Sequence, residues 1–167
     1  MTTHEKITLR AAKPGDARLI HRFVCELALY EREPQAVEVT PEILQVQLET
    51  EPPPFECLIA ELTGEPAGFA LFFHNYSTWK GRRGIWLEDL YVSERYRRRG
   101  VGAALFEGVS RLAVERGCGR LEWAVLDWNR PAIDFYEGLG ASALREWSIF
   151  RLTGDALESL GRHRPPV

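Results

Sequence analysis

The chain has 167 residues, of which 45% are hydrophobic and 27% are charged, values typical of one soluble globular domain with a sizeable core. Its formal net charge of −3 argues against a general nucleic-acid binder. Because no apolar run reaches the length of a membrane span and polar residues follow Met1, we expect a cytoplasmic protein without a membrane partner. We expect a single domain over residues 1–167.

The cysteine and histidine content predicts neither a disulfide framework nor a metal site. Cys25, Cys57 and Cys118 are an odd number without paired spacing, and their apolar sequence neighbours favour structural thiols over a catalytic nucleophile. No two histidines stand at metal-ligand spacing, so we expect no metal. The four histidines are His4, His21, His74 and His163.

The first half of the chain predicts one strand, two helices and then a hairpin of two strands. Residues 6–11 alternate like a half-buried strand, and residues 17–30 carry apolar side chains at helical spacing. Thr40 precedes Pro41 as an N-cap precedes a first helical turn, which predicts a helix through Leu48. Two further strands are expected at 55–62 and 67–73, followed by a polar, basic loop over 75–84 that carries Trp79.

The second half predicts strands and helices in alternation. Strands are expected at 85–92, 121–126 and 144–152, and helices at 101–116, 130–140 and 155–160. The crossover helix between the first two of these strands predicts a parallel pair. We therefore expect an α+β domain with a largely antiparallel sheet and one parallel junction.

A glycine-containing stretch, Arg97–Ala103, joins the strand at 85–92 to the following helix. Gly100 and Gly102 allow the backbone to approach a ligand closely, and a helix that starts here presents unpaired N–H groups and a positive dipole end. With its arginines, the stretch predicts a cradle for a phosphate or pyrophosphate. A tight turn beside a solvated basic run is the alternative. Because Leu105 replaces the third glycine, the stretch is not a dinucleotide fingerprint, and it lacks the ending of a P-loop.

The element order and the R-x-x-G-x-G/A pattern resemble the GNAT superfamily of acyl-CoA-dependent N-acetyltransferases. The resemblance extends over the whole chain, and it is most marked toward the diamine acetyltransferases, which include the spermidine/spermine and thialysine enzymes. It implies a three-layer α/β/α fold, a mixed sheet with a splayed parallel strand pair at the cofactor site, acetyl-CoA as co-substrate, and a homodimer. The matching stretches are Glu26–Glu31, Tyr76–Arg82, Leu87–Val92, Ala124–Asn129, Phe135–Tyr136 and Leu139–Ala141.

The resemblance also implies which residues bind the cofactor. The backbone of Leu90, Tyr91 and Val92 would bond the pantetheine arm of coenzyme A, and Asn129 would bond the cofactor near its thiol. Tyr136 would contact the cofactor and act as the general acid that protonates the departing thiolate, although an aromatic packed between helix and sheet is the alternative. The pyrophosphate would lie on Arg97, Arg98, Arg99, Gly100, Val101, Gly102 and Ala103.

An amine acceptor needs carboxylates and a base, because a primary amine with a pKa of about 10.4 is protonated at neutral pH. Glu88 and Asp89 are adjacent on one strand, so strict alternation predicts that only one of them faces the active site. By resemblance, Glu88 is the candidate base or proton relay. An ordinary pair of surface and loop-bonding acids is the alternative.

By the same resemblance, the amine would be contacted by acidic and aromatic residues, which can hold an extended cation through charge and cation–π contacts. The last strand would supply its pair of residues from the partner subunit. Ser77 stands where the spermidine/spermine enzymes carry an acid, which favours a shorter or less charged amine such as thialysine. The substrate-contacting residues implied are Tyr30, Glu31, Trp79, Glu88, Asp89, Glu146 and Trp147.

We therefore expect direct acetyl transfer to a small diamine or lysine-like amine, without an acetyl-enzyme. Two alternatives are an enzyme of this fold that acetylates a protein lysine or N-terminus, and a non-catalytic module that binds acyl-CoA. The acid and aromatic pattern argues against the first, and the presence of Tyr136 and Glu88 argues against the second.

Overall fold

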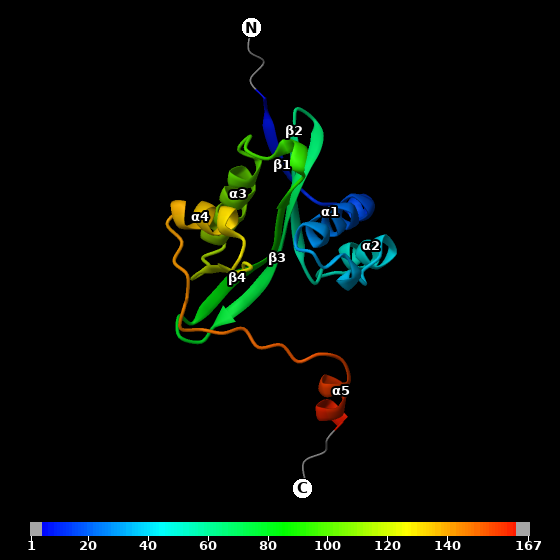
Figure 1. The fold of residues 1–167 in the computed structure, drawn as a ribbon, viewed down its shortest axis with the longest axis vertical. Helices are drawn as coiled ribbons and strands as arrows, with labels where there is room; N and C mark the ends of the chain where they lie inside the picture. Colours follow the sequence, from blue (N-terminus) through cyan, green and yellow to red (C-terminus); the bar gives the residue numbers. More distant parts are fainter. Residues whose placement is uncertain (1–4, 163–167) are drawn as a thin grey trace. The chain divides into compact units, whose positions relative to one another are not determined.

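A computed structural model describes residues 5–162, which fall into two compact units (Figure 1). The first unit ends at Ala124 and the second begins at Val125. His4 and His163, for which the sequence predicts no metal role, lie outside the described residues.

The first unit is built on a five-stranded sheet with strand order β1-β2-β3-β4-β5. Neighbouring strands pair antiparallel except β4 and β5, which pair parallel. The predicted α+β class with one parallel junction is thus confirmed. The strands are β1 (Ile7–Ala11), β2 (Glu56–Leu62), β3 (Glu65–Ser77), β4 (Arg82–Val92) and β5 (Leu121–Trp123).

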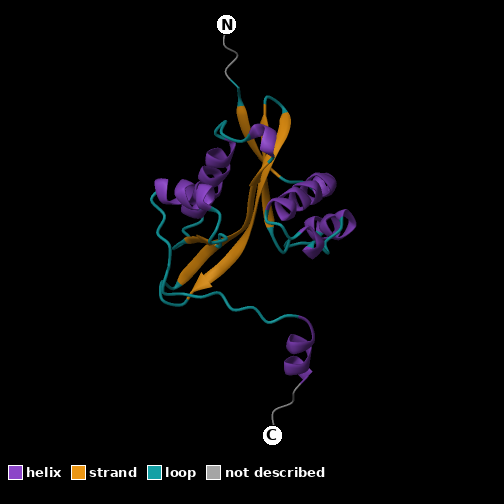
Figure 2. Cartoon of the chain, in the orientation of Figure 1, coloured by secondary structure: helices purple, strands orange, loops and turns teal. Residues whose placement is uncertain are grey.

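Helices cover both faces of this sheet, which gives three layers (Figure 2). The helices α1 (Ala17–Tyr30) and α2 (Pro41–Glu49) pack on one face, where Phe23 stacks on Phe69 with ring centroids 5.6 Å apart. The helix α3 (Val101–Glu115) lies on the opposite face. We call the face of the sheet that α1 and α2 cover the α1 face.

Local sequence accounts for the ends of these helices. The hydroxyl of Thr40 accepts a hydrogen bond from the N–H of Ile43, as expected for the N-cap of α2. In α3, Gly108 allows close packing, because a Cβ there would lie 2.7 Å from a methyl of Leu9 on β1. The α3 helix therefore packs directly against β1 and β2 at this point.

The prediction of a loop over residues 75–84 is wrong. The strands β3 and β4 continue through most of it and pair Asn75 with Gly84 and Ser77 with Arg82, so the turn itself is confined to residues 78–81. The backbone ladder explains the difference, because it holds a hairpin together even where the side chains are polar and exposed. The strand predicted at 121–126 is shorter than expected and ends at Trp123.

The second unit contains the helices α4 (Arg130–Gly138) and α5 (Gly154–Arg162). The prediction of a strand at 144–152 is wrong, because this segment is irregular and pairs with no strand among the described residues. Its alternating apolar side chains are exposed, Phe150 by 94%. The pattern for a strand is present, but a strand also requires a neighbour that accepts its backbone hydrogen bonds.

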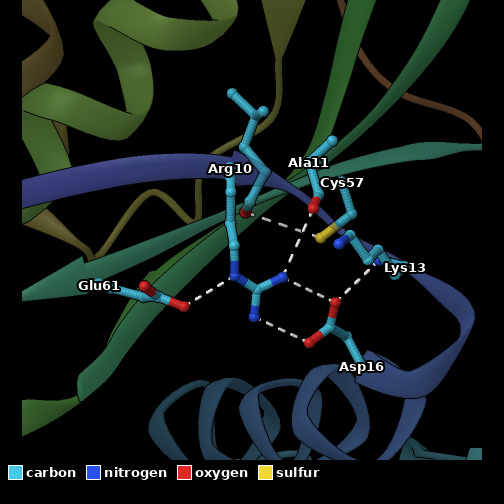
Figure 3. A network of polar contacts seen from close by, with 7 residues as sticks. Arg10, Ala11, Lys13, Asp16, Cys57 and Glu61 are labelled. Carbon is cyan, nitrogen blue, oxygen red and sulfur yellow. Dashed lines mark hydrogen bonds and ion pairs between the residues drawn. The ribbon is translucent and has the colours of Figure 1, made fainter. Parts of the chain in front are cut away.

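An ion-pair network joins β1, β2 and the start of α1 (Figure 3). The guanidinium of Arg10 donates two hydrogen bonds to Asp16, at 2.8 and 2.9 Å, and its Nε donates to Glu61 at 2.7 Å. The backbone N–H of Lys13 also donates to Asp16. Two carboxylates thus share one guanidinium at this end of the α1 face.

Within the described residues, no helix combines the length and the apolar character needed to cross a membrane.

Candidate active site

The stretch between β4 and α3 has the backbone geometry of an anion cradle. Gly100 caps α3 in the left-handed region with φ 83°, and Arg98 also has positive φ, 60°. The first helical hydrogen bond runs from Ala104 N–H to Gly100 C=O, at 3.0 Å. The three N–H groups before it, those of residues 101–103, therefore have no partner in the helix and lie at its positive end. Such a terminus can bind a phosphate group.

The three arginines of the cradle have different surroundings. The side chain of Arg97 lies over the rings of Tyr30 and Tyr91, and Arg99 forms an ion pair with Glu5. Arg98 forms no ion pair with another residue of the described part of the chain. Of the three guanidinium groups, that of Arg98 is the least engaged within the protein.

The end of β4 extends beyond its parallel partner. The pairing of β4 with β5 ends at Leu87 opposite Trp123, whereas β4 continues to Val92. The last residues of β4, including the predicted arm-binding residues Leu90 to Val92, therefore have backbone groups on the β5 side that no β5 residue pairs with. This is the splayed strand pair that the sequence resemblance implied.

A β-bulge in β4 determines where the two adjacent acids point. Leu71 pairs with Asp89 but Phe72 pairs with Leu87, so Glu88 is the extra residue. Asp89 shares a face with Leu71, which packs in the core of the α1 face. The indole N–H of Trp86 donates to Glu88 at 2.7 Å, which draws this carboxylate toward the same side.

The expectation that Glu88 and Asp89 lie on opposite faces is therefore wrong. It assumed strict alternation along the strand, and a bulge adds one residue and resets the alternation. The bulge lets both carboxylates approach the α1 face.

The electrostatic surroundings of these acids are unfavourable to negative charge. Burial, together with the charges of Glu88 and Glu31, raises the pKa of Asp89 to about 7. Burial also raises the pKa of Glu31, which directly follows α1. No lysine or arginine among residues 5–162 forms an ion pair with any of the three. We call Glu31, Glu88 and Asp89 the acidic group. A bound cation would relieve its mutual repulsion.

Two predicted substrate residues lie differently with respect to this group. Tyr30 ends α1 and packs against the core of the α1 face, next to Glu31. Trp79 is in the turn between β3 and β4 and is 91% exposed. Because Asp89 lies seven positions after Arg82 on β4, the turn lies about 23 Å along the strand from Asp89. The first unit therefore does not bring Trp79 to the acids.

The remaining predicted residues belong to the second unit. Asn129 caps α4 by accepting a hydrogen bond from the N–H of Ala132, and Tyr136 lies in the same helix beside Phe135. Burial raises the pKa of Tyr136 to about 12, so its hydroxyl keeps its proton across the neutral range. Glu146 and Trp147 lie in the irregular segment before α5, and the Trp147 side chain is 70% exposed.

Sequence reasoning missed three residues that hold the site together. Trp86 bonds Glu88, and the hydroxyl of Ser93 donates to the carboxylate of Glu26 at 2.6 Å, which links the end of β4 to α1. The spacing of two between Trp86 and Glu88 on a strand could have indicated their contact. Nothing local in the sequence signals a contact between Ser93 and Glu26, which are 67 residues apart.

Comparison with known proteins supplies the family. The pattern of the acetyltransferase (GNAT) family matches residues 21–141, which is more than half of the chain. The chain belongs to the GNAT acetyltransferase family. It is an acetyltransferase, and the sequence resemblance that predicted this is confirmed.

Several named relatives are similar over more than half of the chain. The thialysine N-epsilon-acetyltransferase of Bos taurus is 41% identical over 165 residues, which cover 92% of this chain and 96% of that protein. L-ornithine N5-acetyltransferase NATA1 of Arabidopsis thaliana is 48% identical over 96 residues, 58% of this chain and 42% of that protein. The spermidine/spermine N(1)-acetyltransferase-like protein 1 of Homo sapiens is 31% identical and covers 93% of this chain and 24% of its own length.

Solved structures confirm the GNAT fold. An integron cassette protein from the mobile metagenome of V. cholerae has a TM-score of 0.78 at 24% identity and covers 94% of this chain and 98% of its own. An aminoglycoside acetyltransferase from an uncultured soil sample has a TM-score of 0.75 at 17% identity and covers 89% of this chain and 97% of its own. At these identities the likeness establishes the arrangement of the elements alone.

Proposed function

We propose that the protein transfers the acetyl group of acetyl-CoA directly to a primary amine of a small diamine or lysine-like molecule. The observation that carries this proposal is the acidic group, whose carboxylates have no cationic partner in the described part of the chain. An ammonium group supplies the missing charge. Relatives named for thialysine and L-ornithine acetylation support an acceptor with a terminal amine.

The cradle and the free edge of β4 suit coenzyme A. The unpaired N–H groups at the start of α3 would hold the pyrophosphate, with the side chain of Arg98 beside them. The backbone of Leu90–Val92, beyond the last pair with β5, would bond the amide-containing arm as an added strand does. When bound, acetyl-CoA supplies the activated acetyl thioester.

The nitrogen loses two protons and the thiolate gains one. Glu88, the more exposed of the two adjacent acids, would take the first proton from the ammonium group, directly or through water. The freed amine forms a C–N bond to the acetyl carbon as the C–S bond breaks, and the hydroxyl of Tyr136 would protonate the leaving thiolate. The second proton, which the nitrogen loses as the amide forms, would restore the Tyr136 hydroxyl through water. Asn129 would bond near that thiol. Glu31 and Asp89 would hold the cation.

We also propose that a second copy of the chain completes the amine site. Support comes from the segment at 144–152, whose large apolar side chains are exposed and which has no strand partner among the described residues. In a homodimer this segment would be covered, and Glu146 and Trp147 would reach a site of the partner. Trp79, which the first unit holds away from the acids, would serve in the same assembly. Light scattering tests this, and a strictly monomeric protein overturns it.

An amine panel tests the proposed activity. The protein is mixed with acetyl-CoA and, separately, thialysine, lysine, ornithine, putrescine, spermidine or a lysine-containing peptide, and the release of coenzyme A thiol is followed. We expect release with one or more of the small amines and little with the peptide. Release only with the peptide would favour the protein-acetylating alternative. Binding of acetyl-CoA without release would favour a non-catalytic module.

A Tyr136→Phe variant provides the control for chemistry. It keeps the ring and removes the hydroxyl, so we expect kcat to fall by about 10²–10⁴-fold while the acetyl-CoA affinity changes little. Unchanged turnover would remove Tyr136 from the role of general acid.

A further inference from the structure

The side chain of Arg97 has contacts that link three parts of the first unit. Its guanidinium carbon lies 4.7 Å from the ring centroid of Tyr30 and 5.5 Å from that of Tyr91. Its Nε donates a hydrogen bond to the carbonyl of Val92 at 3.0 Å. Tyr30 ends α1, whereas Tyr91 and Val92 end β4. One arginine thus joins the end of α1 to the end of β4.

A second contact joins the same two elements independently of Arg97. The hydroxyl of Ser93, just after β4, donates to the carboxylate of Glu26 in α1 at 2.6 Å. Glu26 in turn forms an ion pair with Arg22 one helical turn earlier. The last turns of α1 are therefore held against the segment that leads into the cradle.

This junction lies between the two halves of the proposed reaction. Glu31 follows Tyr30 directly and contributes to the charge around Asp89. On the other side, Arg97 begins the stretch whose helical N-terminus would bind the pyrophosphate. A displacement of Tyr30 would therefore move Glu31 away from Asp89 and leave the cradle backbone in place.

We propose that Arg97 is a positioning residue for the amine site, which holds Tyr30 and with it the Glu31 carboxylate in place, and that its side chain is not a phosphate ligand. This inference rests on the proposed function. It separates Arg97 from Arg98, although both are arginines of the same cradle. It also explains why the contact uses arginine, whose planar group can stack on a ring while one edge donates to a carbonyl.

The test compares amine and cofactor affinities in matched variants. Arg97→Met removes the charge and the contacts but keeps an unbranched side chain, and Tyr30→Leu removes the ring from the other side. We expect each to raise the KM for the amine about tenfold, a difference of about 1.4 kcal/mol. The Kd for coenzyme A, measured by calorimetry, should change by less than about threefold, which is under 1 kcal/mol.

Three further variants sharpen the result. Tyr30→Phe keeps the ring that contacts Arg97 and should raise the amine KM less than Tyr30→Leu does. Arg98→Met should show the reverse pattern, with weaker coenzyme A binding and an unchanged amine KM. Arg95→Met removes an arginine that lies 4.6 Å from the ring of Tyr96, outside the proposed site, and controls for lost charge and lost stacking. It should change neither constant.

A double variant tests whether the contact itself is responsible. Tyr30→Leu with Arg97→Met should raise the amine KM no further than the worse single variant, because both act through one contact. If Arg97→Met instead weakens coenzyme A about tenfold and leaves the amine KM unchanged, Arg97 is a phosphate ligand and the proposal is wrong. Should Arg97→Met fail to fold, Arg97→Lys keeps the charge, loses the planar group, and should give the same amine defect.

Failure of the proposed function would be recognised separately. If the unmodified protein acetylates no amine, the proposed function fails, and the calorimetric affinities still decide whether Arg97 contacts the phosphates. In that case the double-mutant cycle is read in the free energy of unfolding. A coupling between Tyr30 and Arg97 would support the junction, and independent effects would overturn it.

Discussion

Carboxylates at the two ends of the α1 face have opposite electrostatic surroundings. At the β1 end, Asp16 and Glu61 share the guanidinium of Arg10, and hydrogen bonds from Arg10 lower the pKa of Asp16 below its ordinary range (Figure 3). At the β4 end, Asp89 has acidic neighbours and burial raises its pKa to about 7. The same sheet face therefore holds one set of acids with a cation and one set without.

The difference separates residues that stabilise the fold from residues kept for binding. The Arg10 network contributes stability, because its charges are paired and hydrogen-bonded although partly removed from water. The acidic group costs stability in the isolated chain, because its charges repel one another. A bound cation would remove this repulsion, which is the physical basis of the amine site proposed above.

Replacing the most buried acid should have the largest effect of the changes considered. Asp89→Asn keeps the shape and removes the charge that would face the ammonium group. We expect kcat/KM for the amine to fall about 100-fold, the range of a hydrogen bond between charged groups, with the Kd for coenzyme A unchanged. Steady-state kinetics and calorimetry measure the two quantities.

A matched control for Asp89→Asn is Asp155→Asn, which makes the same chemical change in the exposed first turn of α5. Its kinetics should equal those of the unmodified protein. If Asp89→Asn also keeps full activity, the acidic group does not bind the amine.

The sequence predicted the elements of the first unit well where periodicity and caps were strong. The helix α1, the capped start of α2 and the parallel strand pair all followed from local pattern. The glycines and arginines of Arg97–Ala103 predicted the cradle. The family resemblance implied that Glu31 and Asp89 belong to the amine site, and this stays a prediction. For the helices the signal lies within one or a few turns, and for the strand pair it lies in the helix that connects the two strands.

What the sequence could not show depends on contacts between distant residues. The bulge at Glu88 arises from how β4 pairs with β3, and no single residue in β4 predicts it. Pattern alone could not say whether the segment at 144–152 has a neighbouring strand. The contact of Arg97 with Tyr30 also joins residues far apart in the chain, so the sequence grouped Arg97 with Arg98 and Arg99 as three equivalent cations.

Removing the cation that the acids at the β1 end share should reduce the free energy of unfolding without affecting catalysis. Arg10→Met leaves Asp16 and Glu61 without their shared cation. Because the side chain of Arg10 is 35% exposed, the loss should be smaller than for a fully buried pair, about 2 kcal/mol in the free energy of unfolding. Urea denaturation measures it.

The kinetic constants of Arg10→Met should match those of the unmodified protein below its melting temperature. Exposed Arg130 pairs with Asp134 one helical turn away, and Arg130→Met serves as the control for loss of a surface ion pair. It should cost less than about 1 kcal/mol. Equal losses in the two variants would contradict a structural role for the Arg10 network.

The pH dependence of stability should differ in sign between the two ends of the face. The ordinary pKa of an aspartate here is 3.8, and in the folded protein that of Asp89 is raised to about 7. The folded state therefore binds the proton more tightly than the unfolded state, so the contribution of Asp89 is fully present below the ordinary pKa and is lost as pH rises through about 7. Asp16 has a lowered pKa, so its contribution is present above 3.8 and is lost as pH falls.

Two variants isolate these slopes in thermal melts recorded from about pH 4 to about pH 8. Asp89→Asn should equal the unmodified protein at the acidic end and gain stability as pH rises, by about 4 kcal/mol above neutrality, since each pKa unit is worth about 1.4 kcal/mol. Asp16→Asn should be less stable at neutral pH, and its deficit should shrink toward the acidic end. The gain of Asp89→Asn should also disappear when a saturating amine is present, because the cation stabilises the ionised carboxylate in the unmodified protein alone. A gain that is independent of both pH and amine would mean that the substitution improves packing and that Asp89 is not held in an uncompensated charge state.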